Sequence, residues 1–296
     1  MTVLASEPGK SRPVLRLLSL GAGVQSTAVL LLACERVIPP FDHALFADTG
    51  WEPRAVHETL SRLRERAAQA GIPIRMVSAG NIRTDALNGT RRFVSMPLHV
   101  LNPDGSKGLA RRQCTSEYKI EPLKKAAREL LGYPHPQRLP AGVYAEQAIG
   151  ISIDEFHRAK DARVNYLHNV FPLIDLGWTR DDCHHYLAER GFGQTVKSAC
   201  AGRPFGGNER WRWLRDHDPD AWAQAVELDK ALATATPTPP MAGSGYAANT
   251  SCTAPAGRWT RSTSTHPPTA AGHYDQSTMS PTRTAAHPGP AAPARR

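Results

Sequence analysis

The feature that most limits the fold of this chain is a succession of three short segments near its start. They are an apolar segment, a loop of small residues and a second apolar segment. Residues 14–20 are apolar and suit a buried strand, Gly21-Ala22-Gly23 comes next, and residues 26–34 are rich in Ala and Leu. A strand that passes through a tight turn into a helix is typical of a parallel α/β sheet. We expect this first helix to begin at the hydroxyls of Ser26 and Thr27.

The rest of the first 232 residues alternates in the same way. The pattern predicts further strands at 44–47, 74–77 and 148–153, and helices at 52–70, 120–131 and 180–190. Such alternation predicts the α/β class, with a mainly parallel sheet and helices on both of its faces. No apolar run reaches 18 residues, so we expect no membrane-spanning helix.

Composition changes sharply near residue 233 and divides the chain. Residues 233–296 contain no Leu, Ile, Val or Phe and are rich in Thr, Ser, Pro and Ala. Such a segment buries too little apolar area to offset its chain entropy, so we predict a disordered tail. We therefore expect a flexible N-terminus at 1–13, a folded domain at 14–232 and the tail at 233–296. A frameshifted terminus would give the same composition, and translating the gene in its other frames tests that hypothesis.

The loop between the first strand and the first helix is the strongest candidate binding site. Small residues let the backbone approach a phosphate closely, and the helix amides and hydroxyls then face the anion. The alternative is an ordinary tight turn with the same spacing. The candidate nucleotide-binding residues here are Ser19, Gly21, Ala22, Gly23, Val24, Gln25, Ser26 and Thr27.

A second candidate segment, Asp48-Thr49-Gly50, follows the second predicted strand. The Asp48 carboxylate could help to hold a metal or a ribose, and Gly50 permits close backbone approach. An ordinary helix N-cap would look the same.

Five motifs in the same order resemble the phosphoadenosine phosphosulfate reductase family of the PP-loop ATP-pyrophosphatase superfamily. Gly21 to Ser26 is similar to the family's pyrophosphate loop, and Asp48-Thr49-Gly50 to its Asp-Thr-Gly. The other three are Cys114 with Lys119-Ile120-Glu121-Pro122-Leu123, the segment 150–158, and Phe171-Pro172-Leu173-Ile174-Asp175. The resemblance covers about residues 15–205.

This resemblance implies a Rossmann-like sheet with an adenine-nucleotide site at the carboxyl ends of its strands. ATP or a related nucleotide would be bound, with Mg²⁺ as a candidate ion. It also implies substrate contacts from Arg111, Arg112, Lys119 and Arg158, and catalytic candidates Gln25, Asp48, Cys114 and Lys119. A solvated basic face before a helix is the alternative for the arginines.

Departures from the family pattern matter as much as the matches. Gln25 stands where ATP-cleaving members carry Asp, and Gln is a poor ligand for a hard cation. The Glu-Cys-Gly-x-His nucleophile motif of true reductases is absent from the sequence, which argues against sulfonucleotide reduction.

The cysteines give a weaker signal. Five scattered cysteines argue against a disulfide framework and favour a reducing, cytoplasmic compartment. Cys114 and Cys200 are weak metal candidates, because relatives carry a second cysteine where this chain has Arg203, and a cation there disfavours zinc or an iron–sulfur cluster. Partly buried, inert thiols are the alternative.

Three functions remain open from the sequence. The first is a PP-loop enzyme that activates a substrate by adenylylation or transfers sulfur. The second is a catalytically impaired nucleotide-binding relative. The third is a protein that modifies tRNA or DNA with sulfur. Residues 233–296 carry five arginines and one aspartate, so they account for +4 of the net charge of +9, and the remaining +5 of residues 1–232 is permissive for this function.

Overall fold

Five parallel strands form the sheet on which the rest of the fold is built. The computed structural model describes residues 14–88, 96, 99–101, 106–109, 113–204 and 206–234. The strand order is β3 (Ile74–Ser78), β2 (His43–Asp48), β1 (Leu15–Leu20), β6 (Ala145–Ile149) and β7 (Leu167–Val170). All neighbouring strands pair in parallel, which confirms the predicted α/β class.

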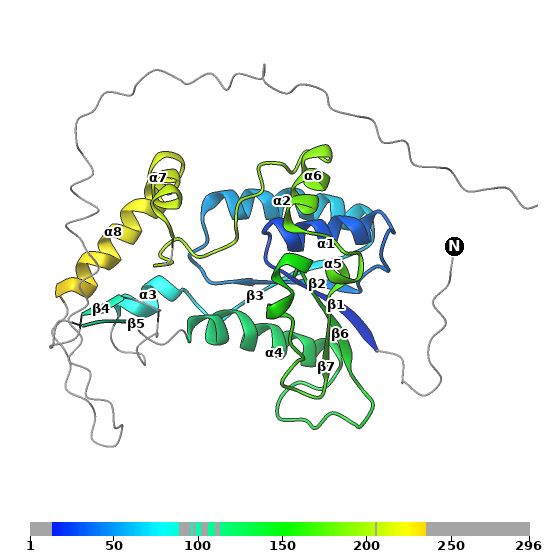
Figure 1. The fold of residues 1–296 in the computed structure, drawn as a ribbon. Coiled ribbons are helices and arrows are strands. Elements are labelled where there is room, and N and C mark those ends of the chain that lie inside the picture. The colour runs from blue at the N-terminus through cyan, green and yellow to red at the C-terminus, as the bar shows by residue number, and fades with distance from the viewer. Residues whose placement is uncertain are drawn as a thin grey trace, which may run out of the picture. The chain divides into compact units, whose positions relative to one another are not determined.

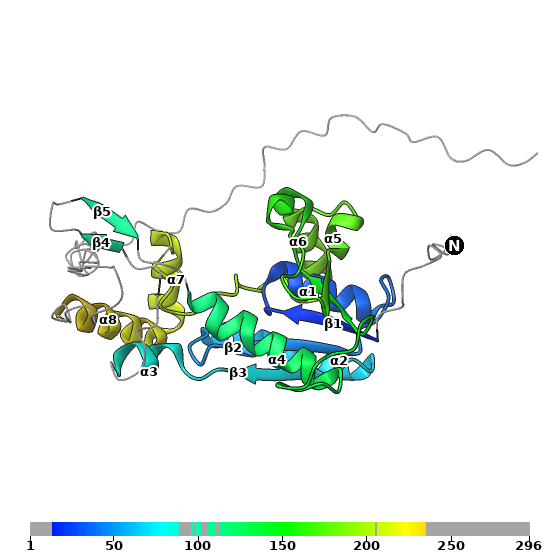
Figure 2. The same cartoon turned by 90° about the horizontal axis from the view of Figure 1, so that it is seen from below.

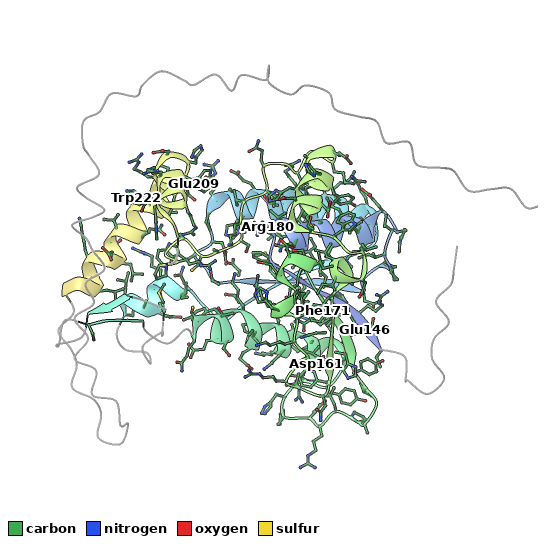
Figure 3. The ribbon with its side chains drawn as sticks, in the orientation of Figure 1. Glu146, Asp161, Phe171, Arg180, Glu209 and Trp222 are labelled. Atoms are coloured by element: carbon green, nitrogen blue, oxygen red, sulfur yellow. The ribbon has the colours of Figure 1, made fainter. Side chains whose placement is uncertain are left out.

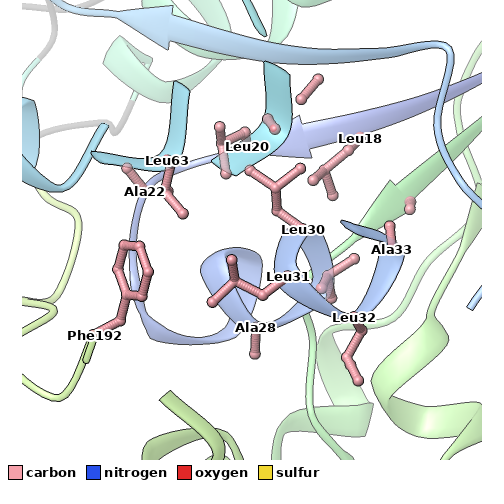
Figure 4. Close-up of a cluster of buried hydrophobic side chains, with 14 of the residues drawn as sticks. Leu18, Leu20, Ala22, Ala28, Leu30, Leu31, Leu32, Ala33, Leu63 and Phe192 are labelled. Atoms are coloured by element: carbon pink, nitrogen blue, oxygen red, sulfur yellow. The ribbon is translucent and has the colours of Figure 1, made fainter. Parts of the chain in front are cut away.

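Helix α1 (Val24–Cys34) is buried on all sides. Its residues Ala28 to Ala33 are each at most 1% exposed, and they pack on β1 and on Leu63 of α2 (Arg54–Gln69) (Figure 4). A helix that is apolar all round is stable only inside a core. The Ala/Leu-rich segment that predicted a helix therefore also dictates that this helix lies at the centre of the fold.

Helices cover both faces of the sheet (Figures 1 and 2). On one face α1 and α2 pack with α6 (Arg180–Glu189), and the short α5 (Pro172–Asp175) adds Leu173 to the same core. On the other face α4 (Glu121–Leu130) places Ala126 and Ala127 against Leu17 and Leu45. The two-layer cover leaves the carboxyl ends of the strands as the open edge of the sheet.

The remaining elements lie around that open edge (Figures 1 and 2). They include α3 (Ile82–Leu87), the π-helix η1 (Ser116–Ile120), the 3₁₀ helix η2 (Ile153–Arg158), α7 (Asn208–His217) and α8 (Pro219–Thr234). A two-stranded antiparallel sheet of β4 (His99–Leu101) and β5 (Lys107–Leu109) completes the set. Helices α7 and α8 meet through the rings of Trp211 and Trp222, which pack edge-on.

Two local predictions need correction. The first helix begins at Val24 rather than Ser26, with Gly23 as its N-cap and no capping side chain. The segment 148–153 was expected to be one strand, but β6 runs from Ala145 to Ile149 and the chain then turns into η2. In the first case a glycine rather than a hydroxyl residue precedes the helix, and in the second Gly150 ends the strand inside a stretch whose apolar residues suggested one element.

Some predictions fall outside the described residues. Residues 1–13 and nearly all of 233–296 belong to this group, so the flexible N-terminus and the tail stay predictions. Helix α8 extends to Thr234, just past the expected end of the folded domain. None of the described helices has both the length and the apolarity that a membrane span requires.

The burial of α1 gives a test of the fold. We predict that Leu31→Ala, a change at a fully buried side chain, lowers the free energy of unfolding by about 3 kcal/mol through the cavity it leaves. Urea unfolding measures this. Val37→Ala is the matched control, because Val37 is 58% exposed and should change stability by less than about 0.5 kcal/mol. Equal effects of the two substitutions would contradict the central position of α1.

Candidate active site

A cavity of about 620 Å³ lies at the carboxyl ends of β1, β2 and β6. The chain runs from β1 outward through β2 to β3, and β6 then returns to the other side of β1, so the strand order reverses between β1 and β6. Open α/β sheets bind their ligands at such a switch point. The lining comes from five stretches of the chain and three single residues, namely 19–26, 47–49, 114–123, 149–158 and 197–204 with Ile82, Met96 and Arg180.

The loop from Gly21 to Ser26 is closed by its own hydrogen bonds. The Ser26 hydroxyl accepts from the amide of Gly21 at 3.1 Å and donates to the carbonyl of Gly23 at 3.2 Å, while Ala22 has a positive φ of 52°. No side chain caps the amides at the start of α1. Such amides, at the positive end of the helix dipole, form an anion site.

Two segments from elsewhere in the chain pack closely against this loop. A Cβ on Gly150 would lie 2.7 Å from the amide nitrogen of Ser26, and one on Gly23 would lie 3.1 Å from that of Ser198. Glycine is therefore required at the end of β6, and the 197–204 segment passes directly over the loop. Gly150 belongs to the sequence motif 150–158, so this motif contains the residue that makes the close contact with the loop.

Positive charge gathers in the cavity beside the helix amides. Arg158, Arg180, Lys197 and Arg203 all line it, and in Figure 3 Arg180 lies between α6 and the sheet. Burial, and then the charges of Arg203, Arg180 and Arg158, lower the pKa of Lys197, whereas Glu155 opposes the shift. Within the described chain no hydrogen bond or ion pair holds the Arg180, Lys197 or Arg203 side-chain cations. An anion bound here would relieve their mutual repulsion.

Gln25 is tied to the one carboxylate among the cavity-lining residues. Its amide nitrogen donates to Glu155 Oε2 at 2.8 Å and to the Ser152 hydroxyl at 3.0 Å. Arg158 pairs with the same Glu155 oxygen at 2.7 Å. Glu155 therefore links the phosphate loop to the cationic group, although the sequence motif 150–158 did not single it out.

The opposite side of the cavity carries two thiols, Cys114 and Cys200, and Lys119 from η1. Lys119 Nζ lies 3.0 Å from Oε1 of Glu52, whose side chain is fully buried and also accepts from Thr49 at 3.2 Å. Burial and then Glu52 raise the pKa of Cys200 to about 11. Glu52 was read only as part of a helix start, because a buried counterion gives no sequence signal.

Comparison with known proteins now decides the family. Residues 16–193 match the sequence model of the phosphoadenosine phosphosulfate reductase domain, which is more than half of the chain. The chain belongs to the phosphoadenosine phosphosulfate reductase domain family. The resemblance that the motifs predicted is therefore confirmed at the family level.

Structural similarity to a solved family protein is low. The phosphoadenylyl-sulfate (PAPS) reductase of Candida auris, solved as a phosphate complex, is 15% identical. Its TM-score with this chain is 0.38, over 64% of this chain and 76% of that protein. No curated protein matches the chain.

A wall of the site lies beyond the reductase-domain match, which ends at residue 193. Arg210 of α7 donates to the carbonyl oxygens of Cys200 at 2.8 Å and of Ala199 and Ala201 at 3.4 Å. The amide of Ala201 donates to the carbonyl of Trp51 at 2.8 Å, and a Cβ on Gly202 would lie 2.0 Å from the Trp51 ring. These contacts fix the 197–204 segment over the phosphate loop.

Most of the residues predicted for the site meet in this cavity. Those that line it are Ser19, Gly21, Gly23, Val24, Gln25, Ser26, Thr49, Cys114, Lys119, Arg158 and Cys200. Four others do not line it: Ala22 and Thr27, which are fully buried, Gly50, and Asp48, whose carboxylate accepts from the Gly50 amide at 2.8 Å. Arg111 and Arg112 lie outside the described residues.

The structure adds residues that the sequence reasoning missed, namely Glu155, Arg180, Lys197 and Ser198. Arg180 is the first residue of a predicted helix and Lys197 lies three residues before Cys200. Nothing in the sequence indicated that the two side chains line one cavity. Among the described residues no group of three or more His, Cys, Asp or Glu side chains could hold a metal ion.

The contact at Gly150 predicts a specific sensitivity. Gly150→Ala should push the Ser26 amide out of place and lower the free energy of unfolding by about 1–3 kcal/mol, as overpacking does. Gly207→Ala is the control, because nothing lies within 4 Å of a Cβ at that position. Urea denaturation compares the two, and a Gly150→Ala variant as stable as Gly207→Ala would contradict the close approach.

Proposed function

We propose that this chain is an enzyme that binds ATP or a related adenylyl nucleotide, with the phosphates over the amino end of α1. One observation carries the proposal: uncapped helix amides and five basic side chains, Lys119 among them, line the same cavity. Helix amides and arginines are the groups that proteins use for phosphates. The cavity volume of about 620 Å³ falls in the range of nucleotide-sized ligand sites.

The reaction proposed is adenylylation of an acceptor, or sulfur transfer to it. In adenylylation an acceptor oxygen bonds to the α-phosphorus of ATP, the α–β phosphoanhydride bond breaks, and pyrophosphate leaves with the electron pair. The α1 amides with Lys197 and Arg203 would stabilise the charge that grows on the leaving pyrophosphate. A base of tRNA or DNA is one candidate acceptor.

Mg²⁺ fits this site only in a limited way. Among the described residues Glu155 is the one carboxylate that lines the cavity, and its Oε2 already accepts from Gln25 and Arg158. Mg²⁺ in nucleotide sites is often held by one carboxylate and the substrate phosphates. Glu155 could therefore hold the ion through Oε1, where it would neutralise phosphate charge.

A binding protein without catalysis is the second candidate, and the state of Gln25 favours it. Gln25 replaces the acidic residue of ATP-cleaving relatives and engages Glu155, so the loop itself offers no carboxylate. Pyrophosphate release from ATP separates the two candidates. Release above background with an acceptor supports the enzyme, whereas tight nucleotide binding without release from any acceptor supports the binding protein.

Removal of the unpaired cations should weaken nucleotide binding. We predict that Lys197→Gln and Arg203→Gln each raise the Kd for ATP about 10-fold or more, because each removes a charged contact worth about 1.5–3 kcal/mol. Isothermal titration calorimetry measures the change. Arg212→Gln removes an exposed cation of α7 and is the control. Equal Kd values for all three variants would exclude the phosphates from this side of the cavity.

A further inference from the structure

Two of the cysteines face one cavity from distant parts of the sequence. Cys114 lies just before η1, and Cys200 lies in the segment that crosses the phosphate loop. The other described cysteines are elsewhere: Cys183 is fully buried in the core and Cys34 ends α1. Cys114 and Cys200 are both partly exposed residues that line this cavity.

The backbone on both sides of this thiol pair is held in place. Arg210 fixes the carbonyls from Ala199 to Ala201, and the Ala201 amide is bound to Trp51. On the other side the amide of Glu117 donates to the carbonyl of Gln113, which closes the turn that contains Cys114. Burial and Glu52 raise the pKa of Cys200, and the charge of a Cys114 thiolate adds to that shift.

We propose that Cys114 and Cys200 form an oxidisable dithiol pair that closes to a disulfide inside the cavity. A low-molecular-weight disulfide is the oxidant. The Cys114 thiolate attacks it, forms a mixed disulfide and expels one small thiol. The Cys200 thiolate then attacks the Cys114 sulfur and expels the second small thiol. Two protein thiols are oxidised and one disulfide is reduced, so the electrons balance.

The surroundings of Cys200 set the order of these two steps. Burial, Glu52 and Cys114 disfavour its thiolate, whereas Lys119 and Arg210 favour it, and the net result is a pKa of about 11. Cys200 is therefore mainly a thiol near neutral pH, which slows the second step. Closure should accelerate as the pH rises from 7 to 9, because the thiolate fraction of Cys200 grows.

The bond would join two segments that carry cavity cations. Cys114 is followed by Lys119, and Cys200 lies between Lys197 and Arg203. A link between these segments would narrow the cavity, and we expect the oxidised chain to bind ATP at least 10-fold more weakly. This consequence rests on the proposed function, but formation of the bond does not.

The experiment oxidises the full chain with glutathione disulfide, blocks free thiols with iodoacetamide and maps peptides without reduction by mass spectrometry. We expect one peptide pair that joins Cys114 to Cys200 and lacks two hydrogens relative to the reduced peptides. Cys114→Ser and Cys200→Ser each abolish the pair. Cys34→Ser and Cys252→Ser are the controls and leave it intact. Separate glutathione adducts on Cys114 and Cys200, or a bond from either to another cysteine, would overturn the proposal.

A second measurement avoids dependence on variants that fail to fold. Phenylarsine oxide bridges two nearby thiols, so the native reduced chain should bind one equivalent and then resist alkylation at Cys114 and Cys200 only. Absence of that protection overturns the proposal. Neither measurement needs a nucleotide. A chain that does not form the dithiol pair can therefore be distinguished from a chain that does not bind ATP.

Discussion

Burial of α1 on all sides is the constraint on which the site depends. The helix has no polar face, so it lies between the sheet and the α2–α6 layer, and its amino end then points to the carboxyl ends of the strands. The amides at that end stay uncapped because Gly23 precedes them and the Ser26 hydroxyl is used within the loop. Packing energy from the core thus holds these amides in a fixed place.

The site also depends on contacts from outside the reductase-domain match. Arg210 and Trp51 hold the 197–204 segment. This segment places Ser198 against Gly23 and brings Lys197, Cys200 and Arg203 to the cavity. The cavity then has two chemically different sides. One is cationic and suited to phosphates, and the other carries two thiols beside a buried Lys119–Glu52 ion pair. An unpaired group such as Lys197 is costly without a ligand, which is a common property of functional sites.

Sequence reasoning found the sheet, the central helix and the tight loop that joins them, because period, turn residues and motif order are local signals. It placed Gln25 and Lys119 correctly in one cavity. It missed the Gln25–Glu155 and Lys119–Glu52 pairs, because a contact between segments far apart in sequence leaves no local pattern. It also expected Thr27 to face phosphate, yet one turn of helix carries that hydroxyl into the core.

The central claim is that phosphates bind against the amides at the start of α1. A crystal structure of the chain with a non-hydrolysable ATP analogue tests it most directly. The account predicts phosphate oxygens within hydrogen-bond distance of the amides of Val24 to Ser26, with Lys197 and Arg203 on the same group. Phosphates bound elsewhere, with this loop and its cations left open, would contradict it.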